Sequence, residues 1–569
     1  MKKRLLSIVL LFPLLVRAGE PLDLARRVAD RVVDRTRFDL EYRLQRAPSD
    51  FGCVDFGRCM DRPGVAYALT SLHCEGDTEE WFELGCSGPV RITIDDSVVY
   101  ERDVPHPFSV QLDEKNFRLP EGFHCRLKRG RHKLLVKTRY DGGEHLFLLQ
   151  SRNFSRYAER GCRIECTLDP YAPQLREARW LVLGTFQTPF PAPLQPDSLL
   201  LFHRTYSDGA RSLAWNIPPL NIVSAPVRNG RFFDWNYHVG CFAWALQRLS
   251  AATGEGKYRS YADAWCDFWL ETSSLAEYQS CGLQAVRSFG YGASGRPMLD
   301  YRSAPAMPYI TRCVESSDAP PSYRQQALEV LDYLRSEQFR VAGVFARNYT
   351  SEPSVWADDM FMGLPYLVYG YRLTGDSQLL EDAVAQLKAF NRLLFDPDAG
   401  LYRQACYPSQ PDVRVPHWSR GNGWALWATC EILDELPHGS ADYRTVLALY
   451  RAHIDGLLRW QDSDGFWRNI LDRAGSERES SGAAIFVYCM ARGINRGWLP
   501  RRYVASLQRA WAALTTFVTE EGDFTGVKGG TNFSTDPADY DRVKFIDSDT
   551  HGLLPFLFAA MEMDRLWGK

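Results

Sequence analysis

Residues 356–371 read WADDMFMGLPYLVYGY, and this stretch decides the fold. After the two aspartates, residues 360–371 carry no charged side chain. A helix that is apolar on every side is stable only when it is buried, because no face of it suits water. The stretch therefore predicts a helix inside the protein, with Asp358 and Asp359 at its beginning.

Similar apolar stretches recur through the second half of the chain, starting roughly 60 residues apart, a spacing typical of a repeated structural unit. They are 237–249, 303–313, 360–371, 424–433, 482–491 and 553–561. Between them lie amphipathic stretches, which predict helices at the surface: 258–271, 322–338, 377–394, 443–460 and 501–518. This alternation predicts a mainly α protein with an (α/α)6 barrel domain over 205–569. The amphipathic segment 22–40 is our candidate for a sixth outer helix that packs on the barrel.

Residues 45–200 follow a different period. Short runs such as 90–94 (VRITI) and 132–137 (HKLLVK) alternate apolar and polar residues, and Gly, Asp and Pro separate the runs. A period of two predicts half-buried strands. We therefore predict a β-sandwich accessory domain over this range. Its RITIDDSVVYERD segment resembles the jelly-roll modules that are attached to many carbohydrate-active enzymes.

The first 18 residues are set apart from both predicted domains. A basic start at 2–4 precedes an apolar run over 5–16 and a small-residue cleavage pattern over 16–18. This order is typical of a signal peptide, so we expect a secreted or periplasmic protein that is not inserted in a membrane. The net charge of -3 gives no basic field, which argues against nucleic acid as a partner.

Each predicted inner helix is preceded by, or opens with, side chains that can act on a sugar. These groups are Trp235-Asn236-Tyr237, Asp300-Tyr301, Trp356-Ala357-Asp358-Asp359, His417-Trp418-Ser419-Arg420, Glu479-Ser480-Ser481 and Asp549-Thr550-His551. Six helix starts at one end of a barrel would place all six groups around one mouth. Aromatic rings stack on sugar faces, and carboxyl groups transfer protons. The sequence therefore predicts a carbohydrate site at this mouth.

Four segments within 230–569 resemble a known family. SVWADDMFMGLP, HWSRGNGWA, ESSGAAIFVY and DTHGLLPFLFAAMEM occur in the order and spacing of glycoside hydrolase family 105, the unsaturated rhamnogalacturonyl and glucuronyl hydrolases, and more distantly of family 88. The resemblance implies that Asp358 is the essential acid and that Asp300 is a second catalytic aspartate. It also implies that the terminal sugar binds in a pocket lined by Trp356, Met362, Trp418, Arg420 and Trp424.

Further residues complete the predicted substrate-binding set. Trp235 and Tyr237 offer stacking surfaces, and His551 is able to orient water or another side chain. Arg420 is the predicted partner of the substrate carboxylate, because a guanidinium matches a carboxylate with two parallel hydrogen bonds. Gln404 follows the Gly-Leu-Tyr turn where family members commonly carry a histidine, which bears on the preferred sugar or linkage.

The chemistry that the resemblance implies begins at the C4=C5 double bond of a 4,5-unsaturated uronic acid. This bond is an enol ether, so an acid above C4 can protonate it, and water then adds at C5 of the oxocarbenium ion. The acid must stay protonated near neutral pH, which requires burial or a nearby like charge. Trp356, Met362 and a facing Asp300 could supply both to Asp358. The sequence has neither a dinucleotide fingerprint nor metal-ligand spacing, so we expect no cofactor.

Two other functions fit the same residues. One is the hydrolysis of a saturated glucuronide by inversion, with Asp300 and Asp358 as the pair of carboxyl groups. The other is carbohydrate binding without catalysis, through the β-sandwich and the barrel mouth. A purely structural role also exists for Asp358 and Asp359, since aspartates cap the first turn of helices.

Overall fold

The structure is a computed structural model that describes residues 21–46, 54–106, 119, 121–143, 145–151, 162–165, 180–187, 206–208, 211–213, 220–226, 232–278, 293, 298–348 and 352–568. The expected signal peptide over 1–18 lies outside these residues. None of the described helices is both long enough and apolar enough to cross a lipid bilayer.

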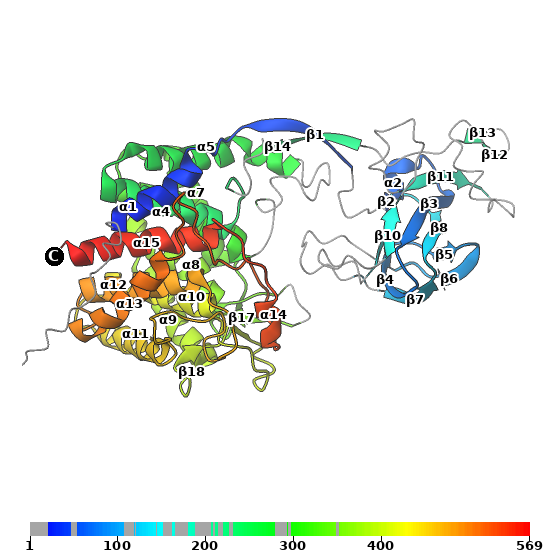
Figure 1. The fold of residues 1–569 in the computed structure, drawn as a ribbon. Helices are drawn as coiled ribbons and strands as arrows, with labels where there is room; N and C mark the ends of the chain where they lie inside the picture. Colours follow the sequence, from blue (N-terminus) through cyan, green and yellow to red (C-terminus); the bar gives the residue numbers. More distant parts are fainter. Residues whose placement is uncertain are drawn as a thin grey trace, which may run out of the picture. The chain divides into compact units, whose positions relative to one another are not determined.

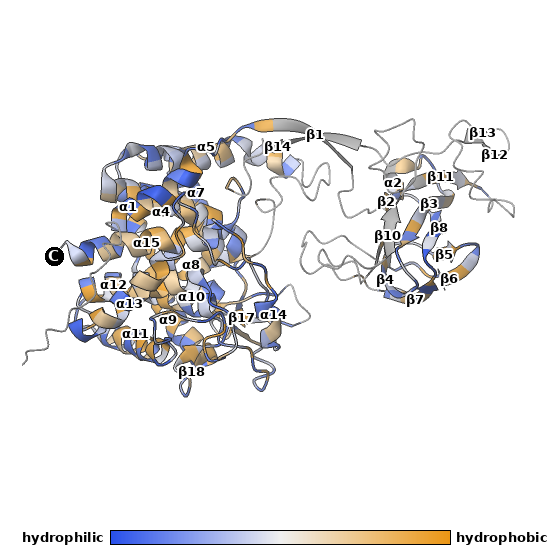
Figure 2. Ribbon diagram, in the orientation of Figure 1, coloured by the Kyte–Doolittle hydropathy of each residue, from blue (hydrophilic) through white to orange (hydrophobic). Residues whose placement is uncertain are grey.

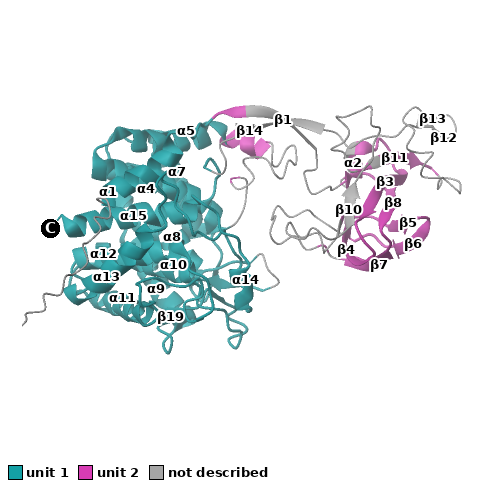
Figure 3. Cartoon of the chain, in the orientation of Figure 1, with its two compact units in different colours: residues 1–38, 227–272, 297–569 teal, residues 39–226, 273–296 magenta. Residues whose placement is uncertain are grey.

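The chain forms two compact units (Figure 3). One comprises residues 1–38, 227–272 and 297–569, and the other comprises 39–226 and 273–296. The sequence placed the start of the barrel domain at 205. The structure assigns residues up to 226 to the other unit, because β14 (Leu220–Pro226) pairs antiparallel with β1 (Leu40–Arg46).

Six buried helices form a closed ring in the first unit. They are α4 (Tyr237–Thr253), α6 (Met307–Glu315), α8 (Asp358–Thr374), α10 (Ser419–Glu435), α12 (Ser480–Asn495) and α15 (Thr550–Trp567). Figure 1 labels all of these except α6. Each packs against the next in this order, and α15 packs against α4, which closes the ring. The predicted helical barrel is therefore confirmed. The first residues of the helix expected at 303–313 form a short 3-10 helix, η4 (Ala304–Ala306), and the α-helix α6 begins at Met307.

Amphipathic helices cover this ring. They are α1 (Pro21–Val33), α5 (Gly256–Glu277), α7 (Pro321–Ser336), α9 (Ser377–Leu394), α11 (Ala441–Arg459) and α13 (Val504–Thr515). On α9, for example, Leu379, Ala383 and Leu387 are buried, whereas Glu381 is exposed. Helix α1 packs on α15 and α4, and Figure 2 shows both hydrophilic and hydrophobic residues along it. Because a helix has 3.6 residues per turn, the apolar residues of these helices gather on the buried face and the polar residues on the exposed face.

The inner helices approach one another closely because glycines line their contacts. A Cβ atom on Gly482 would lie 1.9 Å from Ser419 Oγ, and one on Gly240 would lie 2.2 Å from the carbonyl oxygen of Pro305. Such distances are far below van der Waals contact, so only glycine fits these positions. The close approach matters for function, since it draws together the first turns of neighbouring inner helices.

The second unit contains two antiparallel sheets. The first has the order β10-β3-β8-β5-β6, with β11 also on β3, and the second has the order β2-β9-β4-β7. The strands are β2 (Val54–Asp55), β3 (Gly64–Cys74), β4 (Thr78–Cys86), β5 (Val90–Ile94), β6 (Ser97–Arg102), β7 (Glu121–Leu127), β8 (Gly130–Tyr140), β9 (Leu146–Ser151), β10 (Cys162–Glu165) and β11 (Leu181–Phe186). Side chains from both sheets, including Leu134 and Phe82, share one hydrophobic core. The jelly-roll likeness stays a prediction.

A buried ion network lies at the C-terminal ends of the inner helices. Glu431 on α10 accepts hydrogen bonds from Arg492 on α12, at 2.6 Å and 3.2 Å. Burial acts to raise the pKa of Glu431, but the charges of Arg492, Arg372 and Arg248 outweigh burial and lower the pKa to about 2. Asp434 also pairs with Arg492. Ionised side chains therefore tie neighbouring helices together at this end of the ring.

Replacing Glu431 with Gln should destabilise the protein by about 3–5 kcal/mol, because Arg492 loses a buried counter-charge. Urea unfolding of the two proteins measures this difference. The control is Asp442→Asn, which removes the half-exposed ion pair with Lys388 and should cost less than about 1 kcal/mol. The pKa of Glu431 is lowered on folding, so its stabilising effect should be present above its ordinary pKa and be lost as pH falls toward 2. Equal costs for the two variants would contradict the role of the network.

Candidate functional site

The site is built at the opposite, N-terminal ends of the inner helices, around the start of α8. Strand β17 (Val355–Trp356) pairs with β20 (Ala405–Cys406), and the N–H of Ala357 donates to the carbonyl of Gln404 at 2.7 Å. These bonds fix the chain immediately before Asp358. Asp358 is buried, and its Oδ2 has no hydrogen-bond partner among the described residues.

Arg347 holds the other two carboxylates of the site. Its Nη2 lies 2.7 Å from Oδ1 of Asp359 and 2.9 Å from Oδ2 of Asp300, which lies on the 3-10 helix η3 (Leu299–Tyr301). Its guanidinium carbon stacks 4.2 Å from the centre of the Trp356 ring. The sequence did not reveal Arg347, because it lies in a loop outside the motifs. Asp359 is the closer ionic partner of this arginine.

The pKa of Asp358 is raised from 3.8 to about 7. Burial is the main cause, and the charges of Asp300 and Asp359 add to it, whereas Arg347 and Arg420 oppose it. Asp358 is thus a carboxyl group that carries its proton near neutral pH, beside an Asp300 that is ion-paired. The structure brings Asp358 and Asp300 together as the sequence predicted.

Arg420 is completely buried, and most of its hydrogen-bonding capacity is used within the protein. Its Nη1 donates to Ser481 Oγ at 3.0 Å and to the carbonyl of Lys528 at 2.8 Å, and its Nη2 donates to the carbonyl of Gly529 at 2.6 Å. Nε is buried without a partner among the described residues. A guanidinium has five N–H groups, so Nε–H and one Nη2–H remain. Of the guanidinium predicted to bind a substrate carboxylate, only this edge has no partner among the described residues.

The predicted aromatic and sulfur-containing lining is present but tightly packed. The ring of Trp418 lies under Arg420 at 4.6 Å, and the ring of Trp424 stacks on Phe361 at 4.5 Å. Trp356 is almost wholly buried beneath Arg347, and Met362 is buried on α8. One face of each of these three rings is therefore occupied by a neighbouring side chain, which leaves at most the other face or the edge for a ligand.

Trp235 has a packing role that the sequence did not predict. Its ring stacks on that of Trp265 of α5, with centroids 5.5 Å apart and an angle of 6°, and it contacts Trp269 edge to face. Its N–H donates to the carbonyl of Tyr301 at 2.7 Å. The residue therefore fixes the chain next to Asp300, while Trp265 covers one face of the ring.

Tyr237 and His551 lie together at the junction of α4 and α15. The hydroxyl oxygen of Tyr237 is 2.5 Å from His551 Nε2. The ring of Tyr237 meets that of Trp424 edge to face, with centroids 6.1 Å apart. The predicted role of His551 in orienting a side chain thus has a concrete partner in Tyr237, and sequence patterns could not reveal this pairing across more than 300 positions.

Unpartnered polar atoms occur on Asp358 and on segments that contact its part of the chain: residues 404–406 pair with 355–357, and α10 packs on α8. Among the described residues, the buried atoms without a hydrogen-bond partner include Asp358 Oδ2, Gln404 Nε2, Arg420 Nε and Trp424 Nε1. Gln404 is held from its other side by Tyr540, whose hydroxyl donates to Oε1 at 2.5 Å. Buried polar groups in native proteins nearly always have a partner. Open donors and acceptors on neighbouring segments are consistent with a site that a polar ligand completes.

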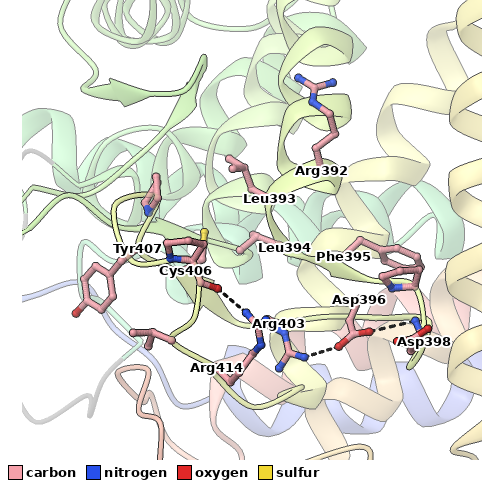
Figure 4. Close-up of a pocket in the computed structure, with 14 residues that line it drawn as sticks. Arg392, Leu393, Leu394, Phe395, Asp396, Asp398, Arg403, Cys406, Tyr407 and Arg414 are labelled. Atoms are coloured by element: carbon pink, nitrogen blue, oxygen red, sulfur yellow. Dashed lines mark hydrogen bonds and ion pairs between the residues drawn. The ribbon is translucent and has the colours of Figure 1, made fainter.

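Two hollows of about 520 Å³ and 630 Å³ lie beside the loops after α9. Both are lined by Asp396, Asp398, Arg403 and Arg414, and Figure 4 shows the first of them, with Arg403 paired to Asp396. Neither contains a predicted catalytic residue. The candidate site is therefore defined by its carboxyl groups and open polar atoms, and not by these hollows.

The fold and the sequence comparison place the chain in the class of glycoside hydrolases. The family pattern described as Glycosyl Hydrolase Family 88 matches residues 224–567, which include the whole inner ring. The chain belongs to this family.

Two curated relatives are similar to parts of this chain. An unsaturated 3S-rhamnoglycuronyl hydrolase of Alteromonas sp. is 33% identical over 220 residues, which are 38% of this chain and 52% of the relative. The unsaturated rhamnogalacturonyl hydrolase YesR of Bacillus subtilis is 26% identical over 320 residues, which are 55% of this chain and 85% of the relative. The chain thus spans about half the length of the first relative.

Among solved structures, a possible member of the GH105 family from Salmonella enterica has a TM-score of 0.52 at 20% identity, and the match covers 60% of this chain and 87% of that one. A second, from Klebsiella pneumoniae, has a TM-score of 0.52 at 19% identity, over 61% of this chain and 86% of that one. At these identities the likeness shows the fold alone.

Replacing Asp300 with Asn should lower the pKa of Asp358 below 7, because the change removes a neighbouring negative charge and leaves Arg347 less neutralised. Carbon-13 NMR of protein labelled at aspartate carboxyl groups measures this titration, and Asp358→Asn identifies the resonance. The control is Asp332→Asn, on the exposed face of α7, which should leave the titration unchanged. A resonance of Asp358 that titrates near 4 in the wild-type protein would contradict the assignment.

Proposed function

We propose that this protein removes a terminal 4,5-unsaturated uronic acid from an oligosaccharide by protonation and hydration of the C4=C5 double bond. The single observation that carries the proposal is Asp358, a buried carboxyl group that has no ionic partner among the described residues and holds its proton near neutral pH. Family 88 membership and relatives named as unsaturated uronyl hydrolases support the same substrate class.

The first chemical step requires a neutral acid above C4. Asp358 donates its proton to C4, and the positive charge that forms is shared between C5 and the ring oxygen. Asp300 and the new Asp358 carboxylate lie beside this cation, and in a dry site such charges stabilise it more strongly than in water. Water then adds at C5. The resulting hemiketal opens, and the rest of the oligosaccharide leaves from C1 without further catalysis.

The substrate carboxylate has a candidate partner in the edge of Arg420 that the protein leaves open. Its Nε–H and remaining Nη2–H can donate to one ligand, and the side-chain N–H groups of Gln404 and Trp424 also have no partner within the described ranges. These donors suit the carboxylate and hydroxyl groups of a uronic acid. We therefore keep Arg420 as a substrate-binding residue, which would contact the carboxylate through its Nε–H and remaining Nη2–H.

Hydrolysis of a saturated glucuronide by inversion suits this site less well. That mechanism needs a second carboxylate that is free to activate water. Asp300 lies 2.9 Å from Arg347 and shares that arginine with Asp359, so its charge is already engaged. Hydration of a double bond needs only one free acid at the start, and the site supplies one.

Replacing Asp358 with Asn should lower turnover at least about 100-fold while substrate binding is retained, because the amide fills the same space but cannot supply the proton. The decay of the ultraviolet absorbance of an unsaturated disaccharide measures turnover, and calorimetry measures binding. Asp332→Asn is the matched control. Wild-type protein that leaves the unsaturated disaccharide intact but releases glucuronic acid from a saturated one would refute the proposal. Full activity of Asp358→Asn would favour a non-catalytic role for this residue.

Turnover should fall as pH rises through about 7, because Asp358 must enter the reaction protonated and its pKa is about 7. Rates at saturating substrate from pH 5 to 9 measure this decrease. In Asp300→Asn the decrease should occur at lower pH, by the same shift as the titration of the Asp358 carboxyl group. A rate that rises through this range would show that the ionised form of the group starts the reaction.

A further inference from the structure

A chain of hydrogen bonds joins α15 to α4 beside the candidate site. Asp549, the N-cap of α15, accepts from the backbone N–H of His551 at 2.9 Å, and its Oδ1 lies 2.5 Å from His551 Nδ1. The other ring nitrogen, Nε2, lies 2.5 Å from the hydroxyl of Tyr237, the first residue of α4. All three side chains are buried. The order of the chain is therefore carboxylate, imidazole, phenol.

The donors and acceptors along this chain can be assigned. Burial acts to raise the pKa of Asp549, but the charges of His551 and His238 and the hydrogen bonds from His551 outweigh it, and the pKa lies well below its ordinary value. Asp549 is thus a carboxylate, which only accepts, so Nδ1 of His551 carries the proton. Nε2 of the neutral ring then accepts from the hydroxyl of Tyr237. The phenolic oxygen of Tyr237 keeps its lone pairs for a further donor.

The same residues do not suit a metal ion. Nitrogen and oxygen atoms of His238, Asp549 and His551 lie within 4.8 Å of one another. However, both nitrogens of His551 are engaged, and His238 Nδ1 pairs with Thr550 Oγ1. The two imidazoles stack nearly parallel, with centroids 4.0 Å apart and an angle of 20°, so their nitrogens do not converge on one point as a tetrahedral site requires. Stacking instead fixes the plane of the His551 ring.

Tyr237 connects this chain with the acid. Burial raises the pKa of its phenol well above the ordinary value, Arg420 opposes the rise, and Asp300 and Asp358 add to it. The residue therefore stays protonated, and its hydroxyl lies within electrostatic range of the groups that hold the sugar. Its ring also contacts Trp424, whose N–H is one of the open donors.

We propose that Tyr237 is a catalytic residue that accepts the proton of the water adding at C5, with His551 and Asp549 as positioning residues behind it. This inference rests on the proposed function. When Asp358 has protonated C4, the water oxygen bonds to C5. One water proton passes to the oxygen of Tyr237 while the Tyr237 proton passes to Nε2 of His551. The imidazolium formed is paired with Asp549.

The proton balance closes within one turnover. The substrate gains one hydrogen at C4 from Asp358 and one hydroxyl at C5 from water, and the second water proton rests on His551. After the product leaves, His551 returns that proton to solvent, and Asp358 takes one up. The other carboxylates near the acid, Asp300 and Asp359, are engaged by Arg347, which leaves the Tyr237 oxygen as an acceptor with a path for the proton behind it.

The test compares Tyr237→Phe with Tyr450→Phe, using the whole protein and an unsaturated disaccharide. Tyr450 is also buried, and its hydroxyl donates to the carbonyl of Cys489 at 2.8 Å, so each change removes one buried hydrogen bond. We expect both variants to melt at similarly reduced temperatures. Only Tyr237→Phe should lower kcat, by about 100-fold, the contribution typical of a general base, with KM nearly unchanged.

Two further variants test the chain behind Tyr237. Asp549→Asn keeps an N-cap but loses the charge that sets the proton on His551, so kcat should fall less than in Tyr237→Phe. The double variant Tyr237→Phe with His551→Gln should be no slower than Tyr237→Phe alone, because both changes break one path. Effects that multiply in the double variant, or a Tyr237→Phe protein with wild-type kcat, would overturn the inference.

Controls separate this inference from the proposed function. Wild-type protein without activity on any unsaturated uronide would refute the proposed function itself. Active wild-type protein, inactive Asp358→Asn and fully active Tyr237→Phe would refute the Tyr237 path alone. Loss of wild-type activity in EDTA, with recovery on adding Zn²⁺, would show that His238, Asp549 and His551 bind a metal and would also overturn the path.

Discussion

The candidate site depends on a shortage of positive charge at the start of α8. Three aspartates, at 300, 358 and 359, meet there, and Arg347 directly pairs with only two of them. The third, Asp358, is buried, has no ionic partner in the part of the chain that the structure describes, and holds its proton. A rise of its pKa from 3.8 to about 7 corresponds to a free energy on the order of 4 kcal/mol. The helix dipole favours the ionised form by only about 0.3–1 kcal/mol, so the effect of burial is larger and the carboxyl group stays protonated.

The pKa values of buried carboxyl groups shift in opposite directions at the two ends of the helical ring. At the C-terminal ends, the charges of three arginines act on Glu431, and its pKa falls to about 2. At the N-terminal ends, Asp358 is also buried, but Arg347 is shared between Asp300 and Asp359. Burial raises the pKa of Asp359 to about 6 although Arg347 contacts it, so a single shared arginine does not offset burial as three arginines do at Glu431. Glu431 therefore stays ionised and holds helices together at the C-terminal ends, whereas Asp358 keeps a proton that it can transfer at the N-terminal ends.

Sequence periodicity was enough to predict the helical ring, because six apolar helices leave few arrangements that bury all of them. The motif match pointed to Asp358 and Asp300, and their catalytic roles stay predictions. Arg347 could not be predicted, because an arginine in a loop carries no periodic signal and its partners are set by tertiary packing. The carbonyl partners of Arg420 and the stacking of Trp235 on Trp265 were hidden for the same reason, since both depend on segments far apart in the chain.

The ring order gives the acid and the proposed water acceptor different positions around the mouth. Following the contacts α4, α6, α8, α10, α12 and α15, the helix that carries Asp358 is three places from the helix that carries His551. Helix α4, which carries Tyr237, lies next to α15, so the hydrogen bond from Tyr237 to His551 crosses a single helix contact. A sugar bound between α8 and the α4–α15 junction would meet a proton donor and a proton acceptor on separate helices. Donation at C4 and acceptance at C5 can then be carried by different groups, and Asp358 need not reverse its role within one turnover.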